Sequence, residues 1–250
     1  MSPVFDLEIR KLARAPVARA ATVAVLLLVA ATTIGGYAAA MHASDTDIGR
    51  KAADLAPTPG WEGFTGLAAT SAGVTMLLAT GIVMAWSVGR EFTDGTVVGL
   101  FAAPPSPGAI ALGKIAVVSA WSISLALAQA LVVATGGVAL GLPVDGVLRA
   151  AAVVTVASGA LGVSALPVMW VATRWRGYLA GIAATLAIVV VTNLAAGFGL
   201  GAFLPWAVPI LWAMPEASLH PALLALPTSV GLLGAVATWN AWRELQLGSA

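Results

Sequence analysis

Six long apolar runs constrain this chain more than any other feature of its sequence. They cover residues 20–41, 67–88, 115–140, 150–172, 178–201 and 222–239, and apart from their ends they contain no Asp, Glu, Lys, Arg or His. A helix needs about 20 apolar residues to cross the hydrocarbon core of a bilayer. Only 9% of the 250 residues are charged, against about 25% in soluble domains. The sequence therefore predicts an all-α integral membrane protein, with six transmembrane helices in a single domain.

Basic residues are distributed unequally between the two sides of the predicted membrane domain. An even number of helices places both termini on one side, together with the connection 89–114 and the short one after residue 172. That side receives Arg10, Lys11, Arg14, Arg19, Arg90, Lys114, Arg174, Arg176 and Arg243, whereas the other side receives Arg50, Lys51 and Arg149. Basic residues favour the cytoplasmic side, so both termini are expected in the cytoplasm. The alanine- and arginine-rich composition is typical of bacteria, which indicates a bacterial plasma membrane.

The N-terminal arm, residues 3–16, has the pattern of an amphipathic helix. At 100° per residue, Phe5, Ile9 and Leu12 share one face. Arg10 and Arg14 lie on the opposite face at a spacing of four residues. Such a helix is suited to lying in the plane of the membrane interface. A solvated leader is the alternative interpretation of this arm.

Several function classes are excluded by composition. The net charge is +1, which gives no reason to expect nucleic acid as a partner. The chain has no cysteine, and its two histidines, His42 and His220, are far apart and without metal-ligand spacing. No metal site is therefore expected. The predicted transmembrane helices carry no His, Asp or Glu for hydrolytic chemistry, so the chain is not expected to be an enzyme.

The stretch GAIALGKI, residues 108–115, resembles a phosphate-binding loop of the form G-x-x-x-x-G-K-[ST]. The position that should carry a magnesium-binding hydroxyl is Ile115, and no strand precedes the stretch. Ser106 followed by Pro107 is instead typical of a helix start. We therefore predict the first turns of a helix here, with Lys114 as a basic anchor at the cytoplasmic interface and no nucleotide site.

The connection 89–114 is the cytoplasmic segment with the most distinctive pattern. Asp94-Gly95 indicates a turn, and Pro104-Pro105 closes the short apolar run that follows it. The run predicts a short helix that presents Val97, Val98, Leu100 and Phe101. These side chains pack against the chain's own helices, dip into the membrane interface, or dock onto a partner.

This connection resembles the cytoplasmic loop of ABC-2-type transporter permeases. The resemblance rests on Glu91-Phe92, on Asp94-Gly95-Thr96, and on the Pro, Ser and Gly-Lys that lead into the third helix. An amphipathic arm, six helices and a Pro/Trp-rich segment at 202–221 extend it over nearly the full chain. The family usually has Arg or Lys just after the Ser, where this chain has Pro107-Gly108-Ala109.

The resemblance implies a permease that pairs with a second permease subunit, identical or different, and binds a separate ATP-hydrolysing subunit. ATP and Mg²⁺ would then belong to that partner, with no cofactor in this chain. The short helix would act as a coupling helix in a cleft of the ATPase. The residues expected to take part in ATPase coupling are Glu91, Phe92, Asp94, Gly95, Thr96, Val97, Leu100 and Phe101. Glu91 and Asp94 are expected to pair with basic groups of the ATPase.

Few polar residues interrupt the predicted transmembrane helices. Gln129 and Asn193 are the candidates for a transport pathway, and helix-to-helix hydrogen bonding is the alternative role for both. The segment 202–221 contains prolines that forbid a continuous helix, so it either re-enters the membrane or lies at its outer interface. The expected cargo is hydrophobic or amphipathic, such as a drug, an antibiotic peptide or a lipid-like molecule. An ATP-independent secondary transporter or a membrane scaffold subunit is the alternative function.

Overall fold

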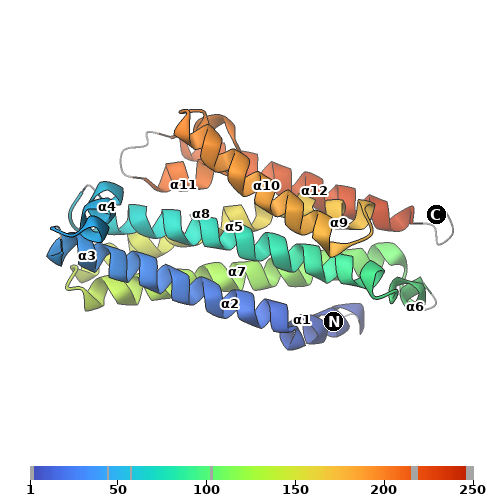
Figure 1. Cartoon of the computed structure of the whole chain (residues 1–250). Helices are drawn as coiled ribbons and strands as arrows, with labels where there is room; N and C mark the ends of the chain where they lie inside the picture. The colour runs from blue at the N-terminus through green and yellow to red at the C-terminus, as the bar shows by residue number, and fades with distance from the viewer. Residues whose placement is uncertain (1–2, 44, 57, 102–103, 215–218, 246–250) are drawn as a thin grey trace.

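The computed structural model describes residues 3–43, 45–56, 58–101, 104–214 and 219–245. Within them, six helical spans are long and apolar enough to cross a membrane, and no strand occurs. The helices run along the long axis of the molecule, with α4 at one end and α6 and both termini towards the other (Figure 1). We call these the α4 end and the α6 end. The predicted all-α fold with six transmembrane helices is confirmed.

Three of the spans are single helices and three are interrupted. The single helices are α5 (Trp61–Thr93), α7 (Pro107–Ala139) and α10 (Tyr178–Gly197). The first span comprises α2 (Pro16–Val29), η1 (Ala30–Gly35) and α3 (Gly36–His42). The fourth comprises η2 (Val144–Gly146), α8 (Val147–Ser164) and α9 (Pro167–Arg174), and the last comprises η4 (Pro221–Leu224) and α12 (Ala225–Arg243).

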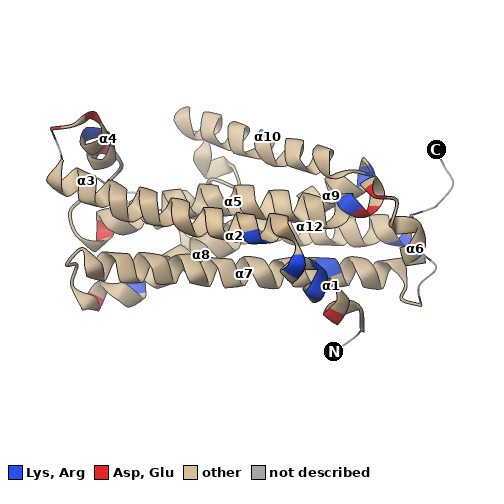
Figure 2. Cartoon of the chain, turned by 60° about the horizontal axis from the view of Figure 1, so that its bottom comes forward, with Lys and Arg blue, Asp and Glu red and all other residues tan. Residues whose placement is uncertain are grey.

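Two spans extend further toward the α6 end than the apolar pattern predicts. The helix α5 continues to Thr93, and α7 begins at Pro107. Arg90 and Glu91 therefore lie within α5, where the sequence had indicated a connection, and Lys114 lies in the first turns of α7, as the predicted helix start at Ser106 implies. Figure 2 shows the charged residues lying towards the ends of the helices, with long uncharged stretches between them.

The helix α5 lies at the centre of the bundle. It packs against α2, α7, α8, α9, α10 and α11. Small residues let its neighbours approach closely: a Cβ atom at Gly81 would lie 2.4 Å from the Thr185 side chain, and one at Gly89 would lie 2.2 Å from the backbone nitrogen of Tyr178. In the most apolar window of each helix, 67% of α5 is buried but only 17% of α10. α10 therefore exposes most of its surface to lipid or to another chain.

Two interruptions have local physical causes. Pro167 has no N–H to continue α8, so α8 ends at Ser164 and α9 begins at the proline. The turn η1 in the first span is a π-helix, in which an extra residue is accommodated within an otherwise α-helical run.

The segment beyond α10 turns back into the bundle. It forms η3 (Gly201–Phe203) and the six-residue helix α11 (Val208–Ala213), which packs against α5 and α8. The indole N–H of Trp206 donates to the carbonyl oxygen of Ser164 at 3.2 Å, which fastens the segment to the end of α8. The segment therefore packs against the bundle, and its re-entry into the membrane stays a prediction. A short helix that the sequence had not indicated, α4 (Asp47–Leu55), lies between the first two spans.

Candidate functional site

A tight turn and a short helix follow α5 at the α6 end. The backbone N–H of Asp94 donates to the Arg90 carbonyl at 2.8 Å, and that of Gly95 donates to the Phe92 carbonyl at 3.2 Å. Gly95 has φ of +69°, a conformation that favours glycine. The helix α6 (Val97–Phe101) comes next, so the predicted turn and short helix are confirmed.

The stretch 108–114 forms the first turns of α7. The hydroxyl oxygen of Ser106 accepts a hydrogen bond from the Ala109 N–H at 3.3 Å, and the N–H of Ile110 donates to the Ser106 carbonyl at 3.1 Å. This is the predicted helix start with a serine cap. Because Ser106 engages the N–H groups of Ala109 and Ile110, these groups are not available to form a cradle for phosphate.

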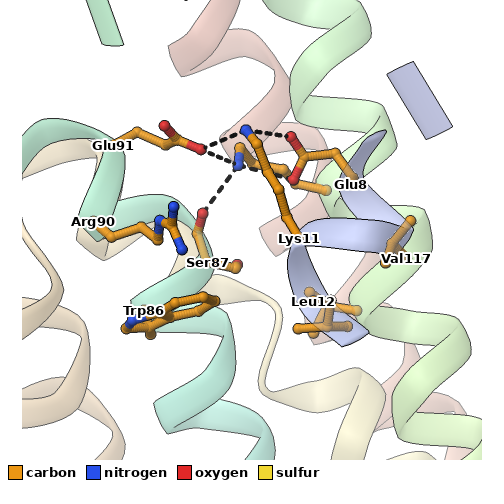
Figure 3. A pocket seen from close by; sticks show the side chains of 10 residues that line it. Glu8, Lys11, Leu12, Trp86, Ser87, Arg90, Glu91 and Val117 are labelled. Carbon is orange, nitrogen blue, oxygen red and sulfur yellow. Dashed lines mark hydrogen bonds and ion pairs between the residues drawn. The ribbon is translucent and has the colours of Figure 1, made fainter. Parts of the chain in front are cut away.

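Four charged side chains from three helices meet beside this connection (Figure 3). We call Glu8, Lys11, Glu91 and Lys114 the charge cluster. The Lys114 ammonium lies 2.8 Å from Glu91 Oε1 and 3.0 Å from Glu8 Oε2. The Lys11 ammonium lies 3.0 Å from Glu91 Oε1 and 3.1 Å from Glu8 Oε1. The cluster ties α1 (Pro3–Arg14) to both α5 and α7.

The charge cluster is largely withdrawn from solvent. The side chains of Glu91 and Lys114 are 2% and 1% exposed, and Lys114 also donates to the Ser87 carbonyl at 3.1 Å. Burial by itself lowers the pKa of Lys11, but Glu8 and Glu91 outweigh that effect and hold its pKa above the ordinary value. Two acids and two bases balance one another, which is the condition for keeping charges in a low-dielectric interior.

The charge cluster is linked to α6 and to the other end of the chain. The Thr96 hydroxyl, just before α6, donates to Glu91 Oε2 at 2.5 Å. Phe92 packs edge-on against the fully buried Trp242 of α12, with ring centroids 6.0 Å apart. The Trp242 indole in turn donates to the Thr173 hydroxyl of α9 at 3.1 Å. A displacement of α6 would therefore be felt by α1, α5, α7, α9 and α12.

The residues predicted for partner docking fall into two groups. Asp94, Gly95 and Thr96 are exposed, and Val98 beside them is 61% exposed. Val97 is buried at 7% exposure. Two further apolar members of the predicted set, Phe92 and Leu100, pack against the chain's own core. The side chain of Phe101 lies outside the described part of the structure.

The structure corrects two expectations about charged residues. The basic partners of Glu91 are Lys11 and Lys114 of the same chain, not groups of another subunit. Lys114 is not an anchor at the membrane surface, because its ammonium is buried between Glu8 and Glu91. Both pairings join segments far apart in the sequence, so neither could be recognised from local spacing.

The helix α1 is present as predicted, but its buried face differs from the predicted apolar face. Glu8 and Leu12 are buried, whereas Phe5 is half-buried and Ile9 is 38% exposed. Two more members of the predicted helix, Arg10 and Arg14, are exposed. The helix buries the face that carries Glu8, because the Glu8 carboxylate meets two ammonium groups there. Sequence reasoning missed Glu8 and Lys11, although opposite charges three residues apart beside Leu12 were a visible signal.

The two predicted pathway residues occupy different environments. Gln129 is fully buried on α7 and donates to the Ala72 carbonyl of α5 at 3.3 Å. Asn193 is exposed on α10 and donates to the Val189 carbonyl at 2.8 Å. Gln129 therefore joins two helices inside the bundle, whereas Asn193 faces a cavity that is considered below.

A comparison with protein families identifies the family to which this chain belongs. The family model described as "ABC-2 family transporter protein" matches residues 4–192. The match includes the charge cluster, α6, the first four spans and most of α10, and it ends before α11. A search of curated proteins gives no match. The length of the match and the six-span bundle together show that the chain belongs to the ABC-2 family, as a membrane-spanning permease.

Proposed function

We propose that this permease is the membrane subunit of an ATP-driven exporter, and that the α6 end docks onto a separate ATP-hydrolysing subunit. ATP and Mg²⁺ then act on the partner, and a second permease subunit completes the transporter. The α6 end faces the cytoplasm in this proposal, as the distribution of basic residues indicates.

One observation carries the proposal. An exposed edge, formed by Asp94 to Thr96 and Val98, is joined directly to the buried charge cluster. The joining contact is the hydrogen bond from Thr96 to Glu91. A partner that moves this exposed edge therefore acts on three helices at once. An exposed edge mounted on a buried network is suited to transmitting force, because a packed interior changes between discrete arrangements rather than yielding continuously.

This geometry leaves fewer residues able to contact the partner than the sequence predicted. Asp94 can pair with a basic group, and Val98 can enter an apolar pocket. Val97 and Leu100 contribute indirectly: they pack on the chain itself and so hold α6 in position. Glu91 acts in the same indirect way, by holding Thr96.

The test is co-purification of the tagged chain with its ATPase from membranes of its own host, after mild solubilisation. We expect a soluble ATPase subunit with the unmodified chain, and at least tenfold less of it with Asp94→Arg or Val98→Asp. Asp145→Arg is the matched control, since Asp145 is exposed in the turn between α7 and α8 at the α4 end. Its ATPase yield is expected to stay unchanged.

Two results would contradict the proposal. Equal recovery of the ATPase with all three variants would show that α6 does not make the contact. Absence of any ATPase under several detergents would favour an ATP-independent transporter or a scaffold subunit.

A further inference from the structure

A cavity of about 160 Å³ lies between α5, α10 and the short helix α11. Its walls include Leu77 of α5, Val189 of α10 and Ile210 of α11. The ring of Trp206 also lines it, while the Trp206 N–H is engaged with Ser164. An apolar protein cavity of about 150 Å³ holds a molecule the size of benzene. The cavity therefore accommodates one ring or a short length of hydrocarbon chain.

Thr192 provides an unused polar group at this cavity. Its hydroxyl is buried and has no hydrogen-bond partner among the described residues, and its side chain lines the cavity. Threonine hydroxyls in helices usually bond to the carbonyl one turn earlier. Thr185 of the same helix does so, donating to the Gly181 carbonyl at 2.9 Å. A buried hydroxyl without a partner is costly. The hydroxyls of Thr33 and Ser158 are also buried and unpaired, but among these three only Thr192 lines this cavity, where a ligand can supply the partner.

The cavity has further polar capacity but no charge. Thr70 and Asn193 also line it, and the single bond from Asn193 to Val189 leaves most of the amide's donors and acceptors free to bind. No Asp, Glu, Lys, Arg or His is among the described residues that line the cavity. A charged ligand would be left without a counter-charge at low dielectric, which is strongly unfavourable.

We propose that this cavity is a cargo-binding site for an uncharged amphipath, which enters from the membrane beside α10. The apolar part of the ligand lies against Leu77, Val189 and Ile210, and a hydroxyl or amide of the ligand bonds to Thr192 and Asn193. α11 forms one wall of the site, so its attachment through Trp206 controls the shape of the cavity. The inference rests on the proposed exporter function only in taking the bound molecule to be cargo.

The test measures binding to the permease alone, without an ATPase. The full chain, reconstituted in phosphatidylcholine nanodiscs, is titrated with a short-chain monoacylglycerol that carries a photoactivatable diazirine on its acyl chain. Peptide mass spectrometry then locates the label. We expect saturable labelling of α5, α10 and α11, competed at least tenfold better by monocaproin than by hexyl sulfate or hexyltrimethylammonium.

Thr192→Val removes the hydroxyl and keeps the shape of the side chain. We expect it to weaken binding threefold to tenfold, the effect of one hydrogen bond to a buried group. Thr185→Val is the matched control on the same helix and is expected to leave binding unchanged. Val74→Trp, which fills the cavity from α5, is expected to abolish saturable labelling.

Three outcomes would overturn the proposal. Labelling that is spread evenly over the exposed helices would show contact with bulk lipid only. Equal affinity of the Thr192→Val and unmodified chains would show that the ligand makes no hydrogen bond with Thr192. Equal competition by the charged amphipaths would contradict the uncharged ligand class. None of these results would bear on ATPase docking, because no ATPase is present in the experiment.

Discussion

The charge cluster and the cavity between α5, α10 and α11 differ in how their buried polar groups are paired. In the charge cluster, each of the four charged side chains has at least two partners within 3.1 Å. At the cavity, the buried hydroxyl of Thr192 has no partner among the described residues. A fully satisfied network fixes one geometry, whereas an unsatisfied group favours any state that supplies its partner. The difference assigns rigidity to the charge cluster and ligand capacity to the cavity.

The largest effect is expected from breaking the charge cluster. Lys114→Met leaves Glu8 and Glu91 with Lys11 as their one remaining base in the cluster. Removing one partner from a buried ion pair costs about 3–5 kcal/mol. We expect that loss in the free energy of unfolding, measured by SDS titration in mixed micelles. Lys51→Met, on the exposed side of α4, is the control and should change it little. A small loss with Lys114→Met would show that water already reaches the charge cluster.

The next effect compares one substitution at the two ends of the bundle. A Cβ atom at Gly89 would meet the backbone of Tyr178 at 2.2 Å, whereas at Gly197 nothing lies within 4 Å. Gly89→Ala should lower the free energy of unfolding by about 1–3 kcal/mol through overpacking. Gly197→Ala should raise it slightly, by at most about 1 kcal/mol, because alanine favours the helix. Similar values for both would mean that α5 and α10 separate easily near the α6 end.

A smaller effect is expected where α11 is fastened. Trp206→Phe removes the indole N–H that donates to Ser164, and such a bond contributes about 0.5–1.5 kcal/mol. We expect faster hydrogen exchange of the α11 amides, with exchange in α5 unchanged. Trp175→Phe, at a side chain that is 61% exposed, is the control. Unchanged exchange in α11 would show that packing alone holds this helix in place.

The smallest effect has the opposite sign. Thr192→Val removes a hydroxyl that is buried without a partner, so the empty permease should gain stability, by no more than about 1 kcal/mol. The midpoint of SDS unfolding measures this change, and Thr185→Val is the comparison. Stability and ligand binding would then move in opposite directions at one residue. A clear loss of stability would instead show that Thr192 already has a partner within the folded chain.

The sequence was sufficient for the helices and insufficient for their mutual contacts. Six apolar runs predicted six spans because backbone polar groups cannot remain unpaired in hydrocarbon. The serine cap at Ser106 and the Asp94-Gly95 turn were also correct, since both depend on neighbouring residues alone. The break at Pro167 was missed, because the apolar run continues through it.

The charge cluster could not be predicted from local pattern. Glu91 and Lys114 each lie at the end of an apolar run, where a charged residue ordinarily faces the membrane surface or water. Their pairing with Glu8 and Lys11 depends on α1 folding against α5 and α7, which is a property of the tertiary structure. The cavity that Thr192 lines likewise forms only when α5, α10 and α11 come together in the tertiary structure.

The contact between Lys114 and Glu8 also imposes an order on synthesis. The two residues are 106 positions apart, so at about 5–20 residues per second roughly 5–20 s pass before the ribosome supplies the partner of Glu8. Lys11 can already meet Glu91 of α5, which is made 23 residues before Lys114, but Glu8 still lacks its partner on α7. Docking of α1 is therefore completed only after α7 has begun, and a chain halted before residue 114 should leave its first helix more accessible to protease than the full chain does.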